Sequence, residues 1–144
     1  MENSRIVVDT NVFISSIIGQ YGFPHKIFKE FIFTGEVILC LSEEVFTEYA
    51  SVSKREKFKQ YQGFEKKSTE LLLAIGEIAE FYSPIKKIAA IEDEPDNRIL
   101  ELAVAAKAKV IITGNHLDFS FKEFEGITIK GPKQFYEEFI GSKK

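Results

Sequence analysis

Residues 5–18 have the sequence RIVVDTNVFISSII, in which a short run of β-branched residues is followed at once by a helical pattern. The run predicts a buried strand over Ile6–Val8, because Val and Ile favour strands and no polar residue interrupts them. The nine residues TNVFISSII predict a helix that ends before Gly19 and Gly22. Asp9 stands at the junction, so we expect a carboxylate at the carboxyl end of the first strand.

The same alternation of strand and helix continues along the chain. Further strands are predicted in EVILCL (36–41), near 86–90, in KVIITGN (109–115) and in GITIK (126–130). Further helices are predicted over 24–33, after an N-cap at Ser42, over 66–81, from 95 to about 106, and in PKQFYEEFI (132–140). This order indicates an α/β fold, a three-layer α/β/α sandwich with a central parallel sheet. Such sheets bind ligands beyond the carboxyl ends of their strands.

Composition limits the class of protein. The 144 residues are expected to form one domain (1–144), with 44% hydrophobic residues, 28% charged residues and a net charge of −3, so a nucleic-acid footprint must be local. Cys40 is the only cysteine and lies in the apolar run VILCL, so we expect a buried, inert thiol. No stretch approaches the ~18 apolar residues of a membrane span, and no signal peptide is evident. A cytoplasmic protein without membrane contact is expected.

Three acids are candidates for one site at the sheet edge. Asp9 follows the first strand, Asp96 opens the buried face of its helix, and Glu48 lies on the apolar stripe of its own helix. Each has a structural alternative. Asp9 can serve as an N-cap, Asp96 as a partner of the helix dipole, and Glu48 in a buried salt bridge with Arg5 or Lys109.

The other acids near Asp96 are given different roles by their positions. Asp93 and Glu94 suit the capping of the helix. Arg98 and Glu101 fall outside the buried stripe, so we expect them to face away from the core.

A fourth group of donors follows the strand in KVIITGN. Asn115 and Asp118 both offer oxygen ligands, whereas His116 is expected to be an exposed loop histidine. Hard cations such as Mg²⁺ and Mn²⁺ need such oxygen-rich pockets, and Zn²⁺ prefers Cys and His ligands that this chain does not group. The acids and Asn115 therefore predict a Mg²⁺ or Mn²⁺ site.

Four segments in this order resemble the PIN-domain family, in particular the small bacterial and archaeal VapC-like toxins of toxin–antitoxin pairs. They are VVDTNVFIS (7–15), LSEEVFTEY (41–49), DEPDNRILELAVAAKAKVIITGN (93–115) and GITIKGPKQF (126–135). The similarity extends from about Arg5 to Phe135, nearly the whole chain.

The resemblance implies a metal-dependent endoribonuclease, often a homodimer, that uses Mg²⁺ or Mn²⁺ and has RNA as substrate. It assigns Asp9, Glu48 and Asp96 as catalytic metal ligands, and places Thr10 and Asn11 beside them as substrate-binding residues. Where the family usually has TGD, this chain has TGN, with Asn115 in place of the acid and Asp118 three residues later. Loss of one negative charge is expected to weaken cation binding, particularly at a second metal site.

A basic segment follows Glu48. Residues 53–67 carry six cations against two acids, a local charge of +4 that leaves −7 for the remainder of the chain. The cations expected to contact phosphates are Lys54, Arg55, Lys57 and Lys59, and the aromatic residues expected to stack on bases are Phe58, Tyr61 and Phe64. The alternative is a solvated connection without a binding role.

Two other functions remain open. A phosphatase of the haloacid-dehalogenase type also uses an acid after strand one, but it needs Asp-x-Asp, and Asn11 occupies the second position here. A non-catalytic RNA-binding or scaffold domain is the second alternative, and Asn115 favours it. A small antitoxin protein is a further expected partner.

Overall fold

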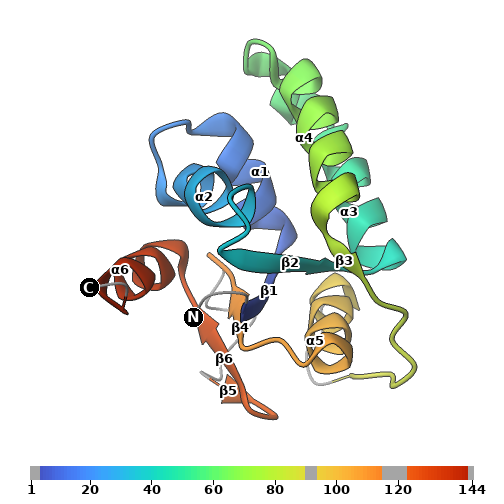
Figure 1. Ribbon diagram of the computed structural model, residues 1–144. Coiled ribbons are helices and arrows are strands. Elements are labelled where there is room, and N and C mark those ends of the chain that lie inside the picture. The colour runs from blue at the N-terminus through green and yellow to red at the C-terminus, as the bar shows by residue number, and fades with distance from the viewer. Residues whose placement is uncertain (1–3, 90–93, 115–122, 143–144) are drawn as a thin grey trace.

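The computed structural model describes residues 4–89, 94–114 and 123–142 (Figure 1). The first half contains β1 (Ser4–Val8), α1 (Thr10–Ile18), α2 (Phe23–Ile27), the π-helical turn η1 (Phe28–Ile32), β2 (Val37–Leu41), α3 (Glu43–Ser53) and the 3₁₀ turn η2 (Glu56–Gln60). The second half contains α4 (Phe64–Ile78), β3 (Glu80–Phe81), α5 (Glu94–Ala106), β4 (Val110–Ile112), β5 (Glu123–Phe124), β6 (Ile127–Lys130) and α6 (Pro132–Ser142).

One six-stranded sheet organises the described residues, with the strand order β3-β2-β1-β4-β6-β5. Ile6 of β1 pairs with Leu39 of β2 on one side and with Val110 of β4 on the other, both in parallel. Among the strand pairs of the described residues, only β5–β6 is antiparallel, so the sheet is mixed rather than wholly parallel. Ile6, Val7 and Val8 have no exposed surface, as expected for a central strand covered on both faces.

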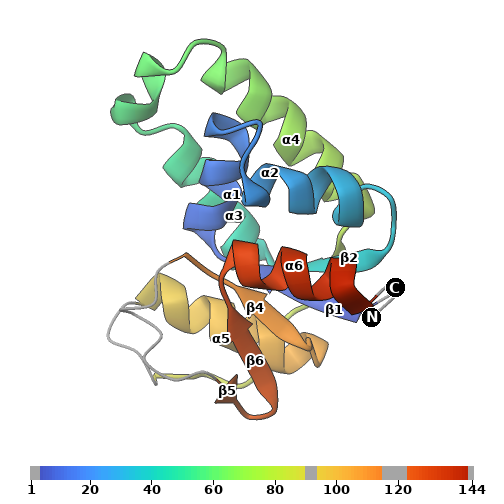
Figure 2. The same cartoon turned by 90° about the vertical axis from the view of Figure 1, so that its left-hand side faces the viewer.

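Helices cover both faces of the sheet. Figure 1 shows α1, α2 and α6 on one face and α5 on the other, and α5 packs on β1, β2 and β4. α3 and α4 rise together as a helical hairpin from the carboxyl end of β2 (Figures 1 and 2). The predicted three-layer α/β/α architecture is therefore confirmed.

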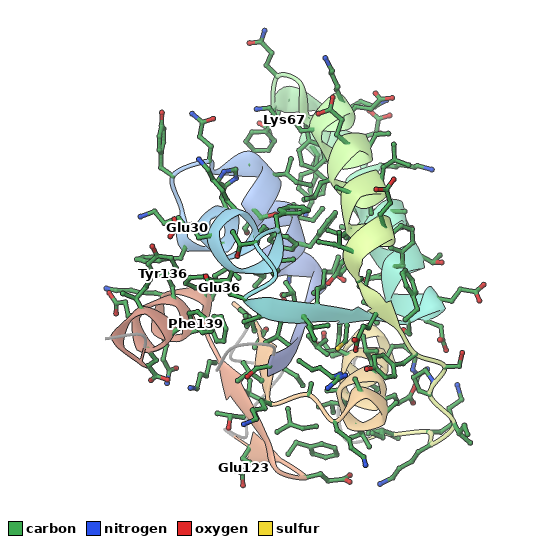
Figure 3. The ribbon with its side chains drawn as sticks, viewed as in Figure 1. Glu30, Glu36, Lys67, Glu123, Tyr136 and Phe139 are labelled. Carbon is green, nitrogen blue, oxygen red and sulfur yellow. The ribbon has the colours of Figure 1, made fainter. Side chains whose placement is uncertain are left out.

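Aromatic packing attaches α6 to η1. The rings of Phe31 and Phe139 lie 4.3 Å apart, and the hydroxyl of Tyr136 donates a hydrogen bond of 2.7 Å to Glu30. Figure 3 shows Tyr136 and Glu30 meeting between the two elements. This contact ties the C-terminal helix to a segment about a hundred residues earlier in the chain.

Several boundaries differ from the sequence prediction. No strand forms over the described residues 86–89, and the edge strand β3 lies instead at Glu80–Phe81, paired with β2. The helix predicted over 66–81 begins at Phe64 and ends at Ile78, because the backbone is already extended at Ala79. The helix predicted over 24–33 is α2 continued by the π-helical η1, and β5 was not predicted.

No helix in the described parts of the chain has both the length and the apolar character needed to cross a membrane.

Candidate active site

Asp9 lies at the carboxyl end of the central strand and is only 3% exposed. Its Oδ1 accepts a hydrogen bond of 2.8 Å from the backbone N–H of Val12, which makes Asp9 the N-cap of α1. Its Oδ2 accepts a hydrogen bond from the hydroxyl of Thr113, at the end of the neighbouring strand β4. The backbone N–H of Asp9 donates to Ile112 O at 3.0 Å. The carboxylate is therefore held in one orientation between two strand ends.

Tyr49 of α3 packs against the same strand end. Its side chain is fully buried, and its hydroxyl donates a hydrogen bond to the carbonyl of Val8, the residue before Asp9. Its ring stacks on Phe13 of α1, with centroids 4.3 Å apart and planes 9° from parallel. Burial, and secondarily the charge of Asp9, raises the pKa of Tyr49 well above its ordinary value, so the hydroxyl keeps its proton and acts as a donor.

The elements that carry the three candidate acids pack against one another. α5 contacts β1 and α3, and α3 contacts α1, whose N-cap is Asp9. Asp96 lies in the first turn of α5 and is half-buried, with its Oδ2 atom shielded from solvent. Asn97, the next residue, has no exposed surface. The N-terminal turn of α5 thus presents polar side chains to the interior.

Glu48 differs from its expected position. The buried residues of α3 include Val45, Tyr49 and Val52, whereas Glu48 is half-buried beside this stripe. Among the described residues Glu48 makes no hydrogen bond or ion pair. Arg5, considered above as its partner, pairs instead with Glu80, with 2.8 Å between Nε and Oε1.

The chemical type of the donor atoms suits a hard cation, because the three acids offer carboxylate oxygens from elements that pack together. Within the described ranges, however, no three His, Cys, Asp or Glu side chains gather closely enough to hold a metal ion. Asn115 and Asp118, the other two predicted ligands, lie outside the described residues. Thr10 is half-buried and Asn11 is exposed in the first turn of α1.

Glu101 corrects a prediction made from the sequence. It was expected to face away from the core, but it is 2% exposed. Its Oε2 accepts hydrogen bonds from Arg98 at 2.7 Å and from the backbone N–H of Ile88 at 2.8 Å. The pair therefore attaches the segment before α5 to that helix, and Glu101 has a structural role.

The single thiol has no catalytic environment. Cys40 on β2 has no exposed surface, and burial together with the charge of Glu80 raises its pKa to about 12. The prediction of a buried, inert cysteine is confirmed.

The basic segment, residues 53–67, lines an open hollow on the surface. The end of α3, η2 and the first turns of α4 surround a volume of about 670 Å³. The cations that line it are Lys54, Arg55, Lys59 and Lys66. Lys57 is exposed but does not line the hollow, and its Nζ lies 5.2 Å from the ring centroid of Phe58.

The aromatic residues of this segment have different roles. Phe58 and Phe64 are buried and stack on each other, with centroids 5.0 Å apart, so the prediction that they stack on bases is wrong. Tyr61 is 40% exposed and lines the hollow. The two Phe rings pack on each other in the connection between α3 and α4, so they are part of the core rather than of a binding surface.

The sequence profile of the PIN domain matches residues 5–117, which include most of β1, all of α3, α5 and β4, and all three candidate acids. The chain belongs to the PIN-domain family. A curated relative of this PIN-domain protein is the uncharacterized protein MJ1680 of Methanocaldococcus jannaschii, which is 31% identical over 143 residues. The match covers 94% of this chain and 91% of the relative.

Two solved structures share the fold of this PIN-domain protein. One is the crystal structure of VapBC2 from Rickettsia felis bound to a DNA fragment from their promoter, with a TM-score of 0.58 and 16% identity over 88% of this chain and 98% of the other. The second is the crystal structure of FitAcB from Neisseria gonorrhoeae, with a TM-score of 0.55 and 18% identity over 89% and 98%. PIN-domain proteins are generally ribonucleases, which agrees with the polar strand edge described above.

Sequence reasoning missed Tyr49 and Thr113 at this edge of the PIN domain. Tyr49 could have been found by following the apolar stripe of α3, since it lies four residues after Val45 and three before Val52. Thr113 directly follows a predicted strand, as Asp9 does, and parallel neighbours end at the same edge.

Proposed function

We propose that this PIN-domain protein is a Mg²⁺- or Mn²⁺-dependent endoribonuclease that hydrolyses RNA phosphodiester bonds at Asp9. The observation that supports this proposal most is the buried carboxylate of Asp9, oriented at the carboxyl edge by Val12 and Thr113. A purely structural N-cap needs only one carboxylate oxygen, whereas both oxygens of Asp9 accept hydrogen bonds that fix their position.

In this proposal Asp9, Glu48 and Asp96 hold the cation, with Asn115 and Asp118 as further oxygen donors. When bound, such a cation supplies Lewis acidity and a positive charge that offsets the charge of the phosphate. The hydroxyl of Thr113 and the N–H of Val12 keep Asp9 fixed, and Tyr49 holds the adjacent carbonyl. Without a cation the carboxylates would repel an RNA phosphate.

The test is cleavage of a fluorescent single-stranded RNA with Mn²⁺ by the wild type, Asp9→Asn and Asp96→Asn. Glu70→Gln is the matched control, because Glu70 is exposed on α4 and the change removes the same charge. We expect both Asp variants to lose cleavage and the control to retain it. Equal cleavage by wild type and Asp9→Asn would refute the proposed site.

Two observations support a second candidate function. The described residues contain no close group of three metal-binding side chains, and Asn115 stands where the family usually has an acid. In that case the chain binds RNA without cleaving it. Binding by wild type without Mn²⁺-dependent cleavage, together with no heat release on titration with Mn²⁺, would favour this function.

We further propose that the protein is the toxin of a toxin–antitoxin pair, that it works in the cytoplasm and that it forms a homodimer. Leu73 and Ile78 on α4 and Phe81 on β3 are exposed apolar side chains of the kind that a partner surface covers. Co-purification with the product of a neighbouring small reading frame tests the pair. Light scattering of the purified chain tests the dimer.

A further inference from the structure

We propose that the hollow between α3, η2 and α4 is an anchoring site for the phosphate backbone of single-stranded RNA, separate from the place of cleavage. This inference deepens the proposed ribonuclease function and rests on it. It predicts that RNA is bound a few nucleotides away from the bond that is cut.

The charge of the hollow favours a polyanion. Four of its lining residues are cations, and Glu65 is the acid among them. Lys59 is in an ion pair with Glu56, 2.9 Å apart, but both side chains are exposed, so a phosphate can replace this partner at little cost. Because the rest of the chain carries −7, approaching RNA is drawn to this end of the molecule.

The hollow is preformed rather than assembled on binding. The stacked pair Phe58 and Phe64 is buried, and Gly63 adopts a left-handed conformation (φ +75°) that lets the chain turn into α4. Backbone hydrogen bonds of 3.1 Å link Arg55 to Phe58, Phe58 to Tyr61 and Tyr61 to Phe64. The lining cations therefore project from a rigid backbone, which lowers the entropic cost of binding.

Tyr61 adds a contact that phosphate binding alone would not require. Its ring is 40% exposed at the rim of the hollow and lies 6.5 Å from the ring of Phe64, measured between centroids. An exposed aromatic ring beside several cations suits a single strand, whose unpaired bases can stack on it. A double helix would present only its backbone and groove edges.

The hollow lies further along α3 than the proposed cation ligand Glu48. Figure 1 shows the tip of the hairpin at the end of α3 opposite the sheet, and Figure 3 shows Lys67 at this same tip. Glu48, the proposed cation ligand on α3, precedes Lys54, which lines the hollow, by six residues, or about 9 Å along the helix at 1.5 Å per residue. At roughly 3.4 Å per stacked nucleotide, this separation corresponds to about three nucleotides. Short RNAs can therefore reach Asp9 or the hollow, but not both.

The test uses a variant that removes the four lining cations, Lys54→Gln/Arg55→Gln/Lys59→Gln/Lys66→Gln. Its matched control removes four exposed cations elsewhere, Lys29→Gln/Lys87→Gln/Lys107→Gln/Lys133→Gln. Fluorescence anisotropy with EDTA measures binding of single-stranded RNA without cleavage. We expect the hollow variant to lower the slope of log K against log salt by about 3, or about 0.7 for each lost contact, and the control to change it little.

Cleavage then tests the separation of the two sites. For the wild type, KM is expected to fall once the RNA exceeds about three nucleotides, because longer strands occupy both places. The hollow variant should lose this dependence on length while its kcat stays similar. Tyr61→Ala should weaken binding without altering the salt slope.

The outcomes separate this inference from the proposed activity. RNA binding that depends on the four cations, without Mn²⁺-dependent cleavage, would support the hollow and refute the nuclease. Cleavage with an unchanged salt slope and an unchanged length dependence in the hollow variant would refute the hollow and leave the nuclease intact. An equal loss in the control variant would also refute it, since net charge alone would then explain binding.

Discussion

Asp9 combines a structural and a proposed catalytic role, and two substitutions separate them. Asp9→Ala removes the N-cap of α1, worth about 1 kcal/mol, and takes an acceptor from the buried Thr113 hydroxyl, worth about 1–3 kcal/mol. Asp9→Asn keeps a capping oxygen, and its amide can donate to the Thr113 hydroxyl. It loses only the charge at the helix N-terminus, about 0.3–1 kcal/mol.

We therefore expect Asp9→Ala to lower the free energy of unfolding by about 2–4 kcal/mol and Asp9→Asn by about 1 kcal/mol or less. Urea unfolding followed by circular dichroism measures both values, and the RNA assay measures activity on the same samples. Both variants should be inactive. Equal destabilisation by Ala and Asn would contradict the hydrogen bonds described here, and an active Asp9→Asn protein would show that the carboxylate is structural only.

Three further predictions concern buried or paired side chains. Tyr49→Phe should cost about 1–2 kcal/mol in urea unfolding, because it removes a buried hydroxyl donor and leaves the ring stacking in place. Glu101→Gln should cost about 2 kcal/mol without changing RNA cleavage, because it removes a buried charge that pairs with a guanidinium. The Tyr82 hydroxyl and Arg5 hold the pKa of Glu80 below its ordinary value of 4.5, so the stability that Glu80 adds is present above pH 4.5 and is lost at lower pH. The stability difference between wild type and Glu80→Gln should therefore vanish on acidification, and a constant difference would argue against the pairing.

Local sequence was sufficient for most helices and strands. β1, β2, β4 and β6 are short runs rich in Val and Ile, and caps such as Ser42 mark where the helices begin. Edge strands carry weaker signals. β3 has only two residues and exists because it pairs with Cys40 and Leu41 of β2, which no local pattern records.

The placement of Asp9 could also be inferred from sequence, because a residue that follows the central strand must lie at the carboxyl edge. The partners of Asp9 could not be inferred in the same way. Thr113 lies 104 residues away, and its hydroxyl meets Asp9 only because β1 and β4 are neighbours in the sheet.

Side chains on the boundary between core and surface were the least predictable. The helical pattern predicts that Glu101 is a surface acid, but the half-buried Arg98 and the backbone N–H of Ile88 both donate hydrogen bonds to it. Phe58 and Phe64 look available for bases, but the turn at Gly63 brings their rings together. The Ile88 backbone and the ring that stacks on Phe64 both belong to segments outside the helix that they contact.

The α/β class and the position of Asp9 at a strand end could be predicted from the sequence, because periodicity and strand order follow from local patterning, and the resemblance of four segments indicated the family. The folded structure was needed to show which carboxylate oxygen of Asp9 is bound by which donor, that Tyr49 rather than Glu48 is buried on α3, and that cations of the basic segment line a hollow at the hairpin tip. These features depend on contacts between residues far apart in the chain, and such contacts are set by the packing of whole elements rather than by any one stretch of sequence.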